Sequence, residues 1–252
     1  MFSKTVTHRS LTIIIRTTPC IVTSPPSISA FTNILVVPAN SQLIGTKFPY
    51  FPHPEFNENN PSKLPNDVPP SKWGSVSLGS GQFYPVQCID GILQLEAPNI
   101  RKITAELEDV EVGQAILTNC QATQNLLPHY DAICHVVPPL WKTKADIQLL
   151  QKAYGSVLDT SLNLNFNLDT TVDTTVDTTV DTTVVSMPLL GCGARGAPTT
   201  ASIFAATTAI KSYQGNGGTL EFCLQREDLA EKLFETLHTY QSKINPRFGY
   251  WE

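Results

Sequence analysis

The chain has 252 residues, of which 41% are hydrophobic and 15% charged, and its formal net charge is −5. A chain of this length can bury a substantial core, and its acidic balance argues against broad electrostatic binding to nucleic acid. No apolar run in the sequence approaches the roughly 18–20 residues that span a bilayer. We therefore expect neither nucleic acid nor a membrane as a partner.

The first half of the chain is irregular. β-Branched runs predict strands at residues 11–17 and 32–37. Residues 1–18 lack acidic side chains and loosely match an organelle transit peptide, although the run LTIIIR within them also favours a strand. Residues 46–85, rich in proline and aromatic residues, predict a long loop or insertion. Residues 168–184 repeat a DTTV unit and predict a solvated loop in which no cation geometry is fixed.

The remaining elements alternate between helix and strand. We expect a helical region at 90–108 broken near Pro98, strands at 115–118 and 132–137, a helix at 145–158, a strand at 184–190, a helix at 199–213, a strand at 220–224 and a helix at 228–240. Such crossovers give a largely parallel sheet with helices on both faces. The predicted fold class is α/β, a single domain over residues 1–252 built as a three-layer α/β/α sandwich with a mixed, largely parallel central sheet.

The most informative segment is a glycine-rich turn between the strand at 184–190 and the next helix. It contains Gly191, Gly193 and Gly196. Glycine allows tight bends and close approach of the backbone to a ligand, and amides near a helix start suit phosphate. We expect Thr199 to cap the helix. A turn without ligand is the alternative, but ligands of such sheets bind at the carboxyl ends of the strands, where this turn lies.

The six cysteines are scattered without metal-site spacing. They are typical of reduced thiols in an intracellular protein, cytoplasmic or nuclear, and we expect no cofactor or metal. Cys192 lies among amides near a helix start, which would lower its pKa, but we interpret it as packing or lining a ligand. No histidine accompanies a nucleophile-elbow motif, and His135 within a strand is interpreted as a packed residue.

Six segments, in order, resemble the macro domain, the ADP-ribose-binding α/β module. They are VVPANSQLIG (36–45), CIDGIL (88–93), VGQAILTN (112–119), YDAICHVVPP (130–139), PLLGCGARGAP (188–198) and LEFCLQREDLAEKLFETL (220–237). The resemblance runs from about residue 11 to residue 240 and implies binding of ADP-ribose or an ADP-ribosylated protein. It also implies that a phosphate loop holds the diphosphate through the backbone amides of Gly191, Cys192, Gly193, Ala194 and Arg195, and ends at Gly196.

On the other side of the ligand, the resemblance implies that the segment at Asp90, Gly91 and Ile92 closes over the diphosphate and that Asn40 bonds the distal ribose. In hydrolytic members the residue at Asp90 orients or activates a water near that ribose. Substrates would be ADP-ribosylated protein, acetylated ADP-ribose or ADP-ribose 1″-phosphate. As alternatives, Asn40 is a turn residue that ends a strand, and Asp90 belongs to an Asp-Gly turn or is a helix N-cap.

The sequence also departs from the family pattern. Asn40 and Asp90 are fifty positions apart, without the usual short run of glycines between them. The family's adenine-reading acidic residue falls near Cys20 and Ile21, and cysteine is a poor acceptor. Arg195 replaces an aromatic residue and would stack on a base, grip a phosphate or point to solvent. Three functions stay open: an ADP-ribose-derivative hydrolase, a binding module without catalysis, and a degenerate protein-interaction fold.

Overall fold

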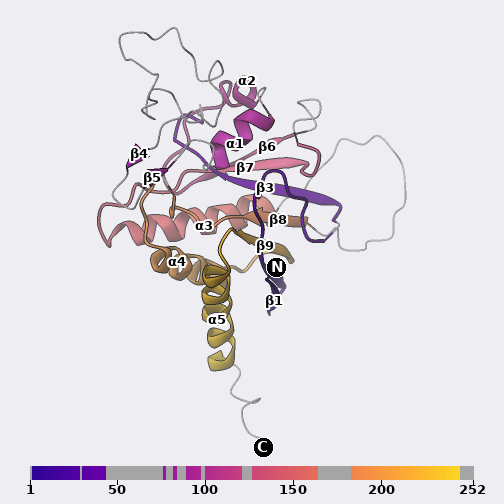
Figure 1. The fold of residues 1–252 in the computed structure, drawn as a ribbon, viewed down its shortest axis with the longest axis vertical. Helices are drawn as coiled ribbons and strands as arrows, with labels where there is room; N and C mark the ends of the chain where they lie inside the picture. Colours follow the sequence, from indigo (N-terminus) through magenta and orange to yellow (C-terminus); the bar gives the residue numbers. More distant parts are fainter. Residues whose placement is uncertain are drawn as a thin grey trace, which may run out of the picture.

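The computed structural model describes residues 2–28, 30–43, 76–77, 82–83, 89–97, 100–120, 127–163, 183–193 and 195–244. Its main sheet has the strand order β1-β2-β9-β8-β3-β7-β6 (Figure 1). The strands are β1 (Ser3–His8), β2 (Leu11–Thr17), β3 (Thr32–Pro38), β6 (Ala115–Asn119), β7 (Ala132–Val136), β8 (Thr183–Met187) and β9 (Gly218–Leu224). The helices are α1 (Ile89–Glu96), α2 (Ile100–Thr104), α3 (Asp146–Leu162), α4 (Thr199–Ser212) and α5 (Glu227–Ile244).

The predicted α/β fold with a mixed, largely parallel sheet is confirmed. β2, β9, β8, β3 and β7 run parallel to one another, whereas β1 and β6 are antiparallel at the two edges. β1 was not predicted. It pairs with β2 through a turn at Arg9, whose φ is 54°, and Val6 is its only buried residue, so its sequence carries little of the apolar alternation that marks a strand.

Helices cover the sheet on both faces (Figure 1). On one face, alternate strand residues such as Ile15 and Phe222 share a buried cluster with residues of α3, α4 and α5. On the other face, Leu35 and Ile133 pack with residues of α1 and α2. Because both faces are covered, the central strands are mostly apolar rather than alternating between apolar and polar residues. This is why their sequences were easy to recognise.

Several predicted boundaries differ in the structure: β9 begins at Gly218 rather than at residue 220, α3 ends at Leu162 rather than at 158, and α5 ends at Ile244 rather than at 240. The strand expected at 184–190 ends at Met187, just before Pro188, because proline cannot donate to a sheet ladder. Thr199 is the first residue of α4 and not its cap. Pro198 occupies the N-cap position, with no side-chain capping bond.

The proline-rich insertion at 46–85 lies outside the described residues, apart from the short antiparallel pair β4 (Val76–Ser77) and β5 (Gln82–Phe83), which the analysis of proline content did not predict. The DTTV repeat also lies outside them, except for the two residues 183–184 at the start of β8. Within the described ranges, no helix is both long and apolar enough to cross a membrane. The five cysteines in those ranges are free thiols.

Candidate functional site

The candidate site is built around residues 188–198, called here the glycine loop, which connect β8 to α4. Gly191 and Gly196 have φ values of +78° and +75°, the left-handed region that favours glycine. The loop closes on itself through two backbone bonds: the Gly196 amide donates to the Gly193 carbonyl, and the Ala197 amide donates to the Gly191 carbonyl, both at 2.9 Å. The turn is therefore fixed by its own backbone.

Four other amides of the glycine loop point elsewhere. Within the part of the chain that the structure describes, the backbone N–H groups of Gly191, Cys192, Gly193 and Arg195 donate to no protein acceptor. Ala194, the fifth amide expected at this site, lies outside the described residues. Unpaired amides on adjacent residues are the donors from which backbone anion sites are made. The loop thus offers donors suited to a phosphate.

Tyr154 of α3 and Ser202 of α4 fix the base of the glycine loop. The Leu190 amide donates to the Tyr154 hydroxyl at 2.7 Å, and the Ser202 hydroxyl donates to the Leu190 carbonyl at 2.7 Å. The two hydroxyl oxygens lie 2.6 Å apart, and both residues are buried. Burial raises the pKa of Tyr154, so its hydroxyl stays neutral. Sequence analysis missed both residues, because each lies on a helix face that is otherwise apolar.

Cys192 corrects one prediction. We expected nearby amides to lower its pKa, but burial raises the pKa of this thiol, and the hydrogen bond with Ser202 opposes that effect only in part. α4 begins at Thr199, seven positions after Cys192, so Cys192 does not belong to the first turn of that helix, where the macrodipole acts. The Cys192 thiol instead lies 3.8 Å from the Leu190 carbonyl. It is a packed thiol at the edge of the loop.

Arg195 connects the glycine loop to its neighbours. Its Nη2 donates to the Ala39 carbonyl at 2.8 Å, and its own carbonyl accepts a bond from the Trp141 amide at 2.8 Å. Burial lowers the pKa of Arg195, while the negative charge of Asp90 acts in the opposite direction. Arg195 therefore does not point into solvent, one of the three orientations left open by the sequence.

The contacts of Arg195 show where Asn40 and Asp90 lie. Asn40 follows Ala39 directly and is in a turn, since its carbonyl accepts a bond from the Leu43 amide at 3.0 Å. Asp90 is in the first turn of α1 and within electrostatic reach of Arg195. The structure thus brings the end of β3, the start of α1 and the glycine loop together at the carboxyl edge of two adjacent parallel strands, β3 and β8.

The other predicted site residues lie in a helix or against a buried cluster. Gly91 and Ile92, which the resemblance placed over the diphosphate, belong to the helix α1, within the helical region expected at 90–108, and Ile92 packs against the buried cluster beneath it. Ile21 is buried, and its carbonyl accepts a bond from the Tyr130 hydroxyl at 2.7 Å. Cys20 is half-buried and packs against the same cluster. The side chain of Ile21 therefore belongs to the core, and those of Cys20 and Ile92 pack against it.

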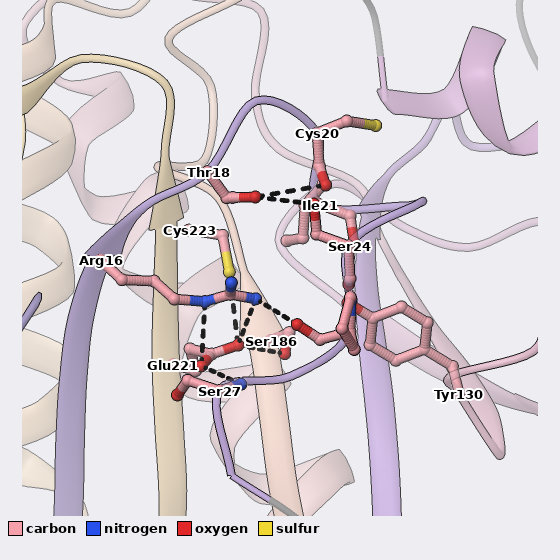
Figure 2. A network of polar contacts seen from close by, with 11 residues as sticks. Arg16, Thr18, Cys20, Ile21, Ser24, Ser27, Tyr130, Ser186, Glu221 and Cys223 are labelled. Atoms are coloured by element: carbon pink, nitrogen blue, oxygen red, sulfur yellow. Dashed lines mark hydrogen bonds and ion pairs between the residues drawn. The ribbon is translucent and has the colours of Figure 1, made fainter. Parts of the chain in front are cut away.

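A buried ion pair was missed by the sequence analysis (Figure 2). Arg16 of β2 and Glu221 of β9 form an ion pair, with Nε 3.0 Å from Oε1, and Arg16 Nη2 donates a hydrogen bond to Glu221 Oε2 at 3.1 Å. Ser186 of β8 donates to Glu221 Oε2 at 2.9 Å. Burial alone would raise the pKa of Glu221, but hydrogen bonds from Ser27 and the charge of Arg16 hold it below its ordinary value. A single charged residue in each of two apolar strands was the signal available in the sequence.

Comparisons with known proteins agree with this fold. Residues 86–206 match the family model of the Macro domain. A point mutant of the Oceanobacillus iheyensis macrodomain with ADPR is 18% identical, with a TM-score of 0.60 over 96% of this chain and 100% of that one. The same macrodomain with ADP is 16% identical, with a TM-score of 0.58 over 97% and 100%.

The Trypanosoma brucei macrodomain in complex with ADP is 15% identical, with a TM-score of 0.54 over 90% of this chain and 68% of that one. No curated protein matches the chain. The fold is that of a three-layer α/β protein. The resemblance to the macro domain found in the sequence is confirmed by the family model over residues 86–206 and by the solved macrodomain structures.

Proposed function

We propose that this chain binds ADP-ribose or one of its derivatives, with the diphosphate on the glycine loop. The observation that carries the proposal is the set of four amides, at Gly191, Cys192, Gly193 and Arg195, without a protein acceptor in the described ranges. Hydrogen bonds to a charged group contribute about 1.5–3 kcal/mol each. The similar solved macrodomains that carry ADPR or ADP support the choice of ligand.

A local site of this kind suits the charge of the molecule. The chain carries a net charge of −5, so its overall field does not attract a dianionic ligand. Backbone amides supply fixed partial charges that act at short range and need no basic patch. Arg195, within the loop itself, adds one formal positive charge. Its positive charge would assist the amides in holding a phosphate.

The position of Asp90 extends the proposal to hydrolysis at the distal ribose. Asp90 lies within electrostatic reach of Arg195, whose guanidinium bonds the residue next to Asn40. An amide and a carboxylate at one edge of a phosphate site can hold a sugar hydroxyl and orient a water without a metal. The substrates would be ADP-ribosylated protein, an acetylated ADP-ribose or ADP-ribose 1″-phosphate. The free thiols of the described ranges support an intracellular, reducing compartment.

Binding is tested by calorimetry and thermal shift with ADP-ribose, ADP, AMP and NAD, because a ligand that binds the folded state raises its stability. The informative variant is Gly193→Ala, since an added Cβ at Gly193 would meet no atom of the described residues within 4 Å. The variant should fold normally and bind ADP-ribose at least about tenfold more weakly, a loss of about 1.4 kcal/mol, because the methyl group would occupy space next to the diphosphate. Gly155→Ala in α3, also without a neighbour within 4 Å, is the matched control. Equal affinity in the two variants would show that the glycine loop does not approach the diphosphate.

Catalysis is tested separately with Asp90→Ala and Asp90→Asn. Each should abolish release of the group from the distal ribose and leave ADP-ribose affinity within about tenfold. Wild-type binding without turnover of any substrate identifies the non-catalytic module. No heat with any nucleotide from a folded protein favours the third function, a protein-interaction surface.

A further inference from the structure

Residues 18–28, called here the 18–28 segment, follow β2 and are held by side chains of the sheet. The segment forms turns rather than a helix or strand. The ion pair beneath it contributes two of its contacts: Arg16 Nη2 donates to the Pro25 carbonyl at 2.8 Å, and Glu221 Oε1 accepts a bond from the Ser27 amide at 2.8 Å. The pair therefore binds the backbone of the segment as well as its own partner (Figure 2).

Tyr130 holds the other end of the same segment. Its hydroxyl lies 2.7 Å from the Ile21 carbonyl and 3.3 Å from the Ser24 carbonyl. Within the segment, the Thr18 hydroxyl donates to the Ser24 hydroxyl at 2.8 Å. Three buried side chains of the sheet region, Arg16, Glu221 and Tyr130, thus bond four successive points of one backbone. Polar contacts are directional, so they specify one conformation of a segment that has no regular structure.

Stability alone does not account for a buried ion pair in this place. Removing two charges from water is costly, and replacing such a pair by apolar residues of similar volume often leaves a protein as stable or more stable. What the apolar replacement cannot reproduce is the pair of bonds to Pro25 and Ser27. Placement of the 18–28 segment is therefore the specific contribution of Arg16 and Glu221.

The strand order gives that placement a functional meaning. The glycine loop leaves β8, Asn40 follows the neighbouring β3 on one side, and the 18–28 segment follows β2 on the other side, beyond β9. All four strands are parallel, so these chain ends lie at one edge of the sheet. Neighbouring strands are about 4.8 Å apart, so β2 lies roughly 10 Å from β8, a distance similar to the length of a nucleoside.

We propose that Arg16, Glu221 and Tyr130 are positioning residues that hold the 18–28 segment as the contact surface for the nucleoside end of the ligand. The inference rests on the proposed function: with the diphosphate on the glycine loop and the distal ribose at Asn40, the nucleoside extends from β8 toward β2. The three side chains do not touch the ligand. They act through the backbone of the segment.

The test compares ADP with inorganic pyrophosphate, which lacks the nucleoside, as ligands of the purified chain. Tyr130→Phe removes the bonds to Ile21 and Ser24 and keeps the buried ring. The double variant R16M/E221L removes the ion pair without leaving a single buried charge. We expect ADP affinity to fall about five- to tenfold in Tyr130→Phe, and further in the double variant, while the affinity for pyrophosphate stays within about twofold. Hydrogen exchange should become faster at residues 18–28 and stay unchanged in β8.

Tyr213→Phe is the matched control, because it removes a buried-ring hydroxyl whose partner, Asn163 Oδ1, follows the end of α3. Its affinity for both ligands should match that of the wild type. Parallel losses for ADP and pyrophosphate in Tyr130→Phe would indicate a general structural role and overturn the inference, as would unchanged ADP affinity. A wild-type chain that binds neither ligand refutes the proposed function instead, and one that binds ADP no more tightly than pyrophosphate refutes the inference alone. If the double variant does not fold, Tyr130→Phe decides the question.

Discussion

The three glycines of the glycine loop allow backbone strain to be separated from packing. Gly191 and Gly196 have positive φ, whereas Gly193 does not. A Cβ at Gly191 would lie 3.2 Å from the Ala197 Cβ and 3.3 Å from Leu150 Cδ1. A Cβ at Gly193 or Gly196 would meet nothing within 4 Å. Alanine therefore introduces both backbone strain and a close contact at position 191, backbone strain alone at position 196, and neither at position 193.

The magnitudes follow from these distances. The left-handed conformation costs an L-residue about 1–2 kcal/mol, so Gly196→Ala should lower the free energy of unfolding by that amount. Crowding in a packed core adds about 1–3 kcal/mol, so Gly191→Ala should lose about 2–5 kcal/mol in total. Gly193→Ala should stay within about 0.5 kcal/mol of the wild type.

The free energy of unfolding is measured by urea denaturation, with the slope of the transition checked for two-state behaviour. Gly196→Asn is the control for strain, since asparagine tolerates positive φ better than alanine, and it should recover much of the loss in Gly196→Ala. If Gly191→Ala costs no more than Gly196→Ala, the contact with Leu150 relaxes freely and the packing argument fails. If Gly193→Ala loses more than about 1 kcal/mol, the backbone of the loop differs from that described.

Three further predictions concern single side chains. Burial lowers the pKa of His135 to about 4, so below about pH 6.5 the unfolded chain binds a proton that the folded chain does not. The free energy of unfolding therefore decreases as the pH is lowered. When the pH is lowered from 7.5 to 5, urea denaturation should show the wild type losing about 2 kcal/mol more than His135→Gln. Tyr154→Phe leaves the buried Leu190 amide without its acceptor and should cost about 1–3 kcal/mol in the same assay; no loss would mean that another acceptor replaces the hydroxyl. Arg195→Met removes the bond to the Ala39 carbonyl and should lower the free energy of unfolding, measured by urea denaturation, by about 1–2 kcal/mol. Arg195→Lys, which retains the charge but not the planar guanidinium group, should have a stability between those of the wild type and Arg195→Met.

The sequence was sufficient for the elements that are buried on both faces or end in marked turns. The run TNILVV predicted β3 to within one residue, because strands covered on both sides are apolar throughout. The break near Pro98 separated α1 from α2 as expected. The glycine loop was recognised because its glycines follow a buried strand and precede a helix, and two of the three have the left-handed φ that such a turn requires.

Interactions between distant residues could not be predicted. Arg16 and Glu221 are 205 positions apart, and nothing local to either strand identifies its partner. Tyr154 was hidden within the apolar face of its helix, because a buried tyrosine has the same periodicity as a leucine. The pKa of Cys192 was predicted in the wrong direction, because the local sequence does not show that this thiol is buried, and burial is the largest effect on its pKa.

The segments at the two ends of the candidate site are held in the same way, by an arginine side chain that donates to a main-chain carbonyl. The glycine loop supplies its donors from the backbone, so its chemistry depends on φ angles rather than on side-chain identity. The segments on either side of it have no regular structure to fix their positions. In both, an arginine donates to a main-chain carbonyl: Arg195 to Ala39, next to Asn40, and Arg16 to Pro25, within the 18–28 segment. Guanidinium groups suit this task because they stay charged when partly buried and offer several donors in one plane. Variants of the glycine loop should therefore change the affinity for the diphosphate, and variants that affect the neighbouring segments should change the selectivity for the groups attached to the diphosphate.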